Sequence, residues 1–162
     1  MEEKSTGIGI VDLKVGDQEY RLLPDDELKI SEETINEDLK NQASYYAFYA
    51  VMQEQADAEL ASAKLALEVV EALLDGEKRK EALASGTKVT EAFISQQIRL
   101  EDQYQEAAIA LNRAKTQVGI LRAIKDGFSH RKDMLVTLAA NMRIQADPSI
   151  HVFKLREKGD KQ

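Results

Sequence analysis

The chain contains no cysteine, no tryptophan, two prolines and four phenylalanines among its 162 residues. The absence of cysteine excludes disulfides, a thiolate nucleophile and zinc sites built on thiolates. Few large aromatic side chains disfavour a large globular core, because these side chains bury the most apolar area. No stretch approaches the roughly 18 apolar residues of a membrane helix. The first residues also lack the apolar run of a signal peptide, so we expect a cytoplasmic protein with no membrane contact.

Strong helix formers dominate what is present: Ala, Leu, Glu, Lys, Gln and Arg. The net charge of −7 is unevenly distributed. Residues 1–110 carry 24 acidic and 11 basic side chains (−13), whereas residues 111–162 carry 5 acidic and 11 basic ones (+6). The basic third could bind a polyanion, or the acidic and basic parts could attract each other head to tail, between protomers or between segments. The sequence alone leaves both interpretations open.

The first thirty residues have the pattern of β structure. Residues 7–13 and 18–23 are strand-like, and Val15-Gly16-Asp17 forms a plausible turn between them. An isolated hairpin is marginal in water, so we expect residues 150–155 to add a strand. The two chain ends would then form one small sheet at one end of the helices.

A long helix is predicted to begin at Ser31, because Ile30 and Ile35 form a hydrophobic staple around that position. Asp75-Gly76 would end or only weaken the helix, and Ser85-Gly86 is the firmer stop. Two heptad columns predict packing along a second helix: Tyr46, Gln53, Leu60, Leu67, Leu74, and Tyr49, Ala56, Ala63, Val70.

A short helix capped by Thr90 should cover residues 91–99, and a second long helix should run from about Asp102 to Ala146. Its apolar seam is predicted as Ala107, Leu111, Ala114, Val118, Leu121, Phe128, Leu135, Ala139, Met142. The predicted fold class is therefore mainly α: a long antiparallel helical hairpin, coiled-coil-like, with a short connecting helix and a small β element.

We divide the chain into a β extension (1–30), a helical core (31–146) and a C-terminal strand with a basic tail (147–162). Two long helices bury only one stripe each, and some apolar residues are left over: Leu65, Val69, Leu73, Ile120, Ile124, Leu138. Self-association would cover them, so a homo-oligomer is predicted. The alternative is that the short helix and the sheet cover them.

Little in the chain suggests catalysis. Gly7-Ile8-Gly9 lacks the third glycine and the helix of a dinucleotide site. His130 and His151 have no zinc-binding context, and no serine has a nucleophile motif. We predict a non-enzymatic protein without cofactor or metal.

Two other groups of side chains allow more than one interpretation. The aromatic run Tyr45-Tyr46-Ala47-Phe48-Tyr49 could stack on unpaired bases, but Tyr46 and Tyr49 fall on the seam, which favours packing. Basic residues of the second long helix form a stripe that could be solvated surface or a phosphate track: Lys115, Arg122, Lys125, Arg131, Lys132, Arg143. The cluster Lys78-Arg79-Lys80 is predicted to be solvated surface or helix C-terminal charge.

The segment Ala123-Ile124-Lys125-Asp126-Gly127-Phe128, with the following Ser129-His130-Arg131-Lys132-Asp133-Met134, resembles the phage recombination mediators of the UvsY type. These proteins similarly place a Gly-Phe pair late in a long helix in a basic setting. The resemblance covers roughly residues 36–146. The chain departs from the pattern by one fewer residue before Gly127 and by its first thirty residues.

The resemblance implies a homo-oligomer, often a closed ring, that binds single-stranded DNA in the host cytoplasm. Such mediators help a RecA-like recombinase to displace the single-strand-binding protein, without catalysis. It implies phosphate contacts by Lys125, Arg131 and Lys132, close helix approach or a bend at Gly127, and packing or anchoring by Phe128. The residues expected to pack or to hold the oligomer are Tyr46, Tyr49, Leu60, Leu67, Leu121, Gly127, Phe128, Leu135. The alternatives are a phage structural or scaffolding protein that does not bind nucleic acid, and an adaptor whose acidic half binds a basic protein.

Overall fold

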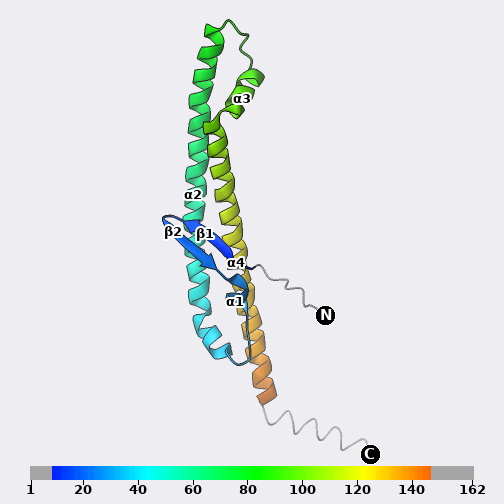
Figure 1. The fold of residues 1–162 in the computed structure, drawn as a ribbon. Coiled ribbons are helices and arrows are strands. Elements are labelled where there is room, and N and C mark those ends of the chain that lie inside the picture. Colours follow the sequence, from blue (N-terminus) through cyan, green and yellow to red (C-terminus); the bar gives the residue numbers. More distant parts are fainter. Residues whose placement is uncertain (1–8, 147–162) are drawn as a thin grey trace, which may run out of the picture. The chain divides into compact units, whose positions relative to one another are not determined.

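The computed structural model describes residues 9–146, and their elements are drawn in Figure 1. The elements are β1 (Val11–Val15), β2 (Gln18–Leu22), α1 (Pro24–Leu28), α2 (Ile35–Ala84), α3 (Glu91–Leu100) and α4 (Asp102–Ala146). The predicted fold class is confirmed: two long helices, α2 and α4, pack together, a short helix connects them, and two strands form a small antiparallel sheet. The predicted strand 150–155 and the basic tail lie outside the described residues.

Local capping signals fix the turn between the long helices. Helix α2 continues through Gly76 and ends at Ala84, where Gly86 adopts φ +69°. The amides of Gly86 and Thr87 donate to the carbonyls of Leu83 and Ala82, which is the pattern of a Schellman motif. The Thr90 hydroxyl accepts from the Phe93 amide at 3.2 Å and starts α3. The predicted cap, stop and α4 boundaries are therefore confirmed.

The start of α2 differs from its prediction. The helix begins at Ile35, after a turn over residues 32–34 in which the Ser31 hydroxyl accepts from the Thr34 amide at 3.3 Å. Ser31 thus caps this turn rather than the helix. Helix α1 was not predicted, although Pro24 at its first position and three acidic residues in its first turn favour a helix start.

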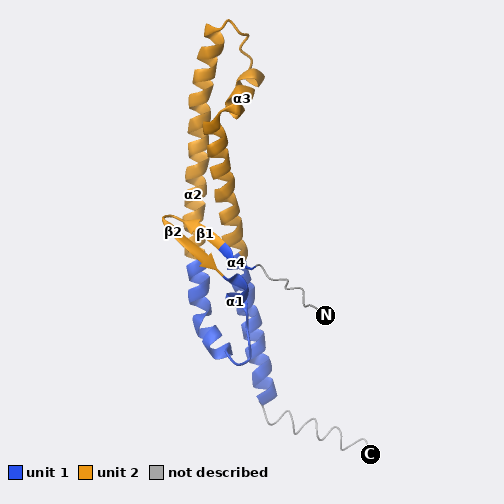
Figure 2. Cartoon of the chain, viewed as in Figure 1, with its two compact units in different colours: residues 1–11, 23–49, 124–162 blue, residues 12–22, 50–123 orange. Residues whose placement is uncertain are grey.

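The chain divides into two compact units, coloured separately in Figure 2. Unit 1 comprises Met1–Val11, Leu23–Tyr49 and Ile124–Gln162, and unit 2 comprises Asp12–Leu22 and Ala50–Ala123. Helices α2 and α4 therefore contribute residues to both units. Each unit has its own buried side chains and is described by itself.

In unit 2 the sheet packs against both long helices. The Gly16-Asp17 connection has φ +63° at Gly16, a conformation that glycine adopts without steric cost. The Gly16 amide donates to the Glu59 carboxylate, and the Gln117 side-chain amide donates to the Lys14 carbonyl. Glu59 and Gln117 lie well inside α2 and α4, so the expected position of the sheet at one end of the helices is wrong.

A second small core of unit 2 forms where α3 folds back. Leu74 and Ala82 of α2 are buried with Ile94 and Ile98 of α3. Partly buried Val70, Val89, Phe93 and Tyr104 surround them. The short helix therefore covers the last turns of the α2 seam.

Candidate nucleic-acid interface

The core of unit 1 is built on stacked aromatic rings. Phe128 of α4 is fully buried, and its ring stacks on Tyr45 and Tyr49 of α2 with centroids 5.4 and 5.1 Å apart. Gly127 brings α1 close, because a Cβ at this position would lie 3.1 Å from a methyl group of Leu28. The expected close approach at Gly127 and the packing role of Phe128 are confirmed, and the neighbour at Gly127 is α1.

Tyr49 is buried, as predicted, and its hydroxyl donates to the Glu27 carboxylate at 2.6 Å. Burial, and then this hydrogen bond, raise the pKa of the Tyr49 phenol far above its ordinary range. Tyr46 is 41% exposed, so its expected place in the seam is wrong. Tyr45, one position earlier, occupies the place against Phe128 instead.

Arg131 is not a surface cation, which overturns its predicted phosphate contact. Its side chain is 3% exposed and donates to Asp38 Oδ1 at 2.7 Å, Gln42 Oε1 at 2.7 Å and the Lys29 carbonyl at 3.2 Å. Gln42 in turn donates to the Phe128 carbonyl at 2.6 Å. The guanidinium therefore joins α2, α4 and the segment after α1, and it cannot reach a phosphate while unit 1 is folded.

A groove of about 540 Å³ crosses the surface of unit 1 between α2 and α4. It is lined by Leu39, Gln42, Ala43, Tyr46, Phe128, Ser129 and Lys132. Tyr46 is the exposed ring on the α2 side, and the Lys132 ammonium is on the α4 side. Among the residues that the structure describes, Lys132 pairs only with the neighbouring Asp133 at 3.1 Å, and both side chains are more than half exposed. Such a pair contributes little, so Lys132 can exchange this partner for a phosphate.

The other predicted cations divide between the two units. Lys125, half-buried, and Arg143, exposed, belong to unit 1 with Lys132. Lys125 and Lys132 are seven residues apart and therefore share one side of α4. Lys115 and Arg122 are exposed in unit 2. Without the buried Arg131, the predicted stripe therefore keeps five cations, three in unit 1 and two in unit 2.

The residues predicted to pack or to hold the oligomer differ in burial. Leu121 and Leu135 are fully buried, whereas Leu60 and Leu67 are half-buried. Of the apolar residues expected to be left over, Ile124 is buried, but Leu65, Val69 and Leu73 are at least half exposed. The short helix and the sheet therefore do not cover these three residues of α2.

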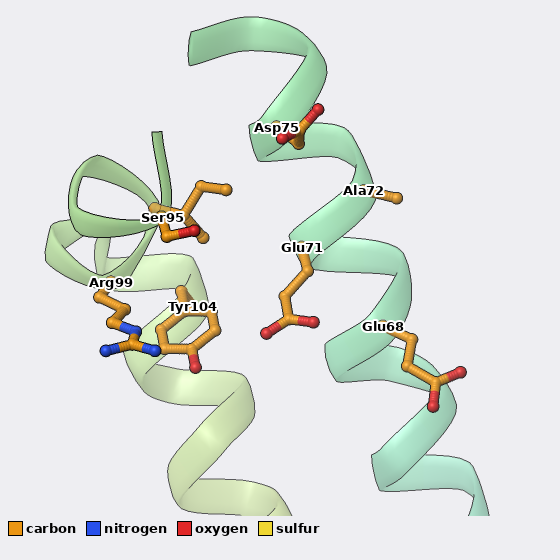
Figure 3. Close-up of a pocket in the computed structure, with 8 residues that line it drawn as sticks. Glu68, Glu71, Ala72, Asp75, Ser95, Arg99 and Tyr104 are labelled. Atoms are coloured by element: carbon orange, nitrogen blue, oxygen red, sulfur yellow. The ribbon is translucent and has the colours of Figure 1, made fainter. Parts of the chain in front are cut away.

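Unit 2 contains a cleft of about 420 Å³ whose α2 wall is acidic. Figure 3 shows Glu71 directed toward Arg99 and Tyr104 across the cleft, whereas Glu68 is directed away from them. Asp75 pairs with Arg79 at 2.7 Å, a contact that lowers the pKa of the carboxyl group. This wall would repel a nucleic acid.

The cluster Lys78-Arg79-Lys80 was predicted to be solvated surface or helix C-terminal charge, but two of its members form ion pairs. Lys78 contacts Glu81 at 3.1 Å and Glu101 at 2.6 Å. Arg79 binds Glu91 as well as Asp75. These hydrogen bonds raise the pKa of both cations. The two residues therefore tie the end of α2 to α3 and to the start of α4.

Within residues 9–146, no group of three acidic or histidine side chains is arranged to hold a metal ion. No helix of that range is long and apolar enough to cross a membrane. Comparison with family models, with curated proteins and with solved structures gives no match to this chain.

The sequence interpretation missed the partners of Arg131 and the groove. A usable signal existed, because Gln42 shares a heptad column with Ile35, Tyr49 and Ala56. A single amide in an apolar column predicts a buried polar partner on the facing helix. The groove had no comparable signal, since it depends on Tyr46 being exposed.

Proposed function

We propose that the protein is a non-enzymatic recombination mediator that binds single-stranded DNA as a homo-oligomer and promotes loading of a RecA-like recombinase. The observation that carries the proposal is the groove of unit 1, where the exposed Tyr46 ring and the Lys132 ammonium line one cavity. The resemblance of residues 123–134 to the UvsY-type mediators supplies the biological role. The recombinase and the single-strand-binding protein are the partners proposed with it.

An aromatic ring and a lysine in one groove, with Lys125 on the same side of α4, suit an unpaired strand. A base stacks on an aromatic face whatever its identity, and a lysine neutralises a phosphate without reading sequence. In this proposal Tyr46 stacks on a base, while Lys125 and Lys132 contact phosphates. Arg143, exposed in the last turn of α4, extends the basic side of unit 1.

One groove with few cations gives weak binding, because affinity grows with the number of phosphates neutralised. The chain is acidic overall, which also opposes binding to polyanions away from the groove. A homo-oligomer overcomes both limits, since it presents one groove per subunit to the same strand. Oligomer formation is therefore part of the proposal.

Fluorescence anisotropy with a labelled single strand tests the proposal. Lys125→Ala with Lys132→Ala should weaken binding and reduce the slope of log K against log salt by about 0.7 per lost phosphate contact. Tyr46→Ala should weaken binding with little change of that slope, because it removes stacking. Lys40→Ala is the control, since Lys40 is an exposed lysine of unit 1 that belongs to α2 and not to the basic side of α4.

If the unaltered protein binds no single strand at low salt, the proposal is wrong. If it binds but the Lys125 and Lys132 changes act no more strongly than Lys40→Ala, DNA is bound elsewhere. The exposed apolar residues Leu65, Val69 and Leu73 of α2 favour a second candidate, a phage structural or scaffolding protein. Such a protein would assemble without any affinity for nucleic acid.

A further inference from the structure

A second heptad stripe follows the face of α2 opposite the buried seam. Val51, Ala58, Ser62, Leu65, Val69 and Ala72 recur at spacings that combine three and four residues, and all six are exposed. Leu65 is 61% and Val69 50% exposed. The Ser62 hydroxyl already donates to the Ala58 carbonyl at 3.0 Å, so it needs no other partner. We call these six residues of unit 2 the α2 outer face.

A complementary surface lies on α4 of the same unit. Ile109, Asn112, Thr116, Gly119 and Ala123 are exposed at spacings of three and four residues, and the Thr116 hydroxyl donates to the Asn112 carbonyl. A groove of about 550 Å³ runs beside this α4 outer face, between α4 and strand β1, with Ile109, Ile120 and Leu13 among its lining residues. The α4 outer face is thus a small-residue surface beside an apolar hollow.

The charges near the two outer faces decide whether α2 docks on α2 or on α4. Residues 51–72 carry five acidic side chains and one basic one. Glu59 binds the Gly16 amide and Glu71 is directed across the cleft, so Glu54, Asp57 and Glu68 against Lys64 leave a net −2 for the outer face. Residues 109–123 carry three basic side chains and no acidic one, a net +3: Arg113, Lys115 and Arg122. Two α2 outer faces would repel each other, whereas an α2 face and an α4 face attract.

We propose that the α2 outer face of one subunit docks on the α4 outer face of the next copy of this chain, with Leu65 and Val69 entering the groove beside β1. The two surfaces belong to different parts of the chain, so the contact is heterologous. A heterologous contact repeats from subunit to subunit and closes into a ring or extends as a filament. Lys115 and Arg122, predicted as phosphate contacts, then face the neighbouring subunit.

This inference rests on the homo-oligomer in the proposed function, and its test contains no DNA. Variant A, Leu65→Asp with Val69→Asp, places carboxylates in the apolar contact and leaves the α4 face intact. Variant B, Arg113→Glu with Arg122→Glu, reverses the charge of the α4 face and leaves the α2 face intact. Leu83→Asp is the control, because Leu83 is a 72% exposed leucine of α2 outside the outer face. All altered side chains are exposed, and circular dichroism checks that each variant is folded.

Sedimentation measures the masses. The unaltered protein and Leu83→Asp should exceed the mass of a dimer, and A and B should each fall to the 18.1 kDa subunit. An equimolar mixture of A and B should form a one-to-one dimer of twice 18.1 kDa, because one intact α4 face meets one intact α2 face. The proposal is overturned if the unaltered protein is a monomer, if B alone still dimerises, or if the mixture stays monomeric. Failure of the groove variants to affect DNA binding would leave these masses unchanged.

Discussion

Replacing Arg131 by Met tests the assignment of this residue to the core of unit 1. Met has a similar length and no charge, so Arg131→Met removes the donors while filling most of the space. The Asp38 carboxylate, the Gln42 side-chain oxygen and the Lys29 carbonyl each lose a hydrogen bond from the guanidinium. The free energy of unfolding should therefore fall.

Removing one partner of a buried ion pair typically costs about 3–5 kcal/mol. Here Asp38 stays 17% exposed and also accepts from the Thr34 hydroxyl at 2.8 Å, so part of its charge remains solvated or hydrogen-bonded. We therefore expect a loss of about 2–4 kcal/mol. For a chain of this length, that corresponds to a fall of about 5–10 °C in Tm.

Urea unfolding followed by circular dichroism, at one fixed protein concentration, measures this loss. Lys132→Met is the control: it removes an exposed cation from the next position of α4 and should cost less than about 1 kcal/mol. Asp38→Asn combined with Arg131→Met should cost less than the sum of the single changes, because the two charges interact directly. An unchanged midpoint for Arg131→Met, together with weakened DNA binding, would refute the structural role.

Three further predictions concern local features. Gly76→Ala should raise the free energy of unfolding by about 0.5–1 kcal/mol. The gain from Gly127→Ala should be smaller by at least about 0.5 kcal/mol, because the new Cβ would lie 3.1 Å from Leu28. Urea unfolding midpoints compare the two variants, and equal gains in stability would contradict the close contact. Thr90→Ala removes the cap of α3 and should lower the stability of this helix by about 1 kcal/mol. Hydrogen exchange should become faster in the first turn of α3 alone, and unchanged exchange there would contradict the cap. The raised pKa of Tyr49 means that its contribution to stability is complete below the unfolded value near pH 10 and is lost as the pH rises toward the folded value. Ultraviolet titration should therefore find one fewer ionising phenol in the folded protein than in urea, a difference that Tyr49→Phe removes; equal counts would contradict the burial.

Helix ends were predictable because each depends on a few neighbouring residues. Thr90 and the Ser85-Gly86 pair carry their capping chemistry in the sequence, and the structure uses both. Pro24 carried a similar signal, but its helix spans only five residues and has no apolar period to reveal it. The start of α2 was misplaced because Ser31 caps a turn, a role that serine plays as readily as a helix cap.

The errors on the two helices have different physical causes. The buried positions of α4 in unit 1 are Ile124, Phe128, Arg131 and Leu135. Phe128 and Leu135 were predicted in the seam, and Ile124 and Arg131 lie four residues before them, in the second column of the same heptad. On α2, a straight helix turns about 20° relative to a heptad in every seven residues, so the position that faces Phe128 four heptads before Leu74 is Tyr45 and not Tyr46. Whether an arginine on the border of a seam is buried depends on its partners, which come from segments distant in the sequence.

The mass of the protein in solution, measured by sedimentation with and without a labelled single strand, tests the central claim most directly. We predict a multiple of the 18.1 kDa subunit in the absence of DNA. At low salt the strand should sediment with that multiple, and added salt should release it. An oligomer that never carries the strand would contradict DNA binding and favour the scaffolding role. A monomer of 18.1 kDa under both conditions would contradict the assembly as well.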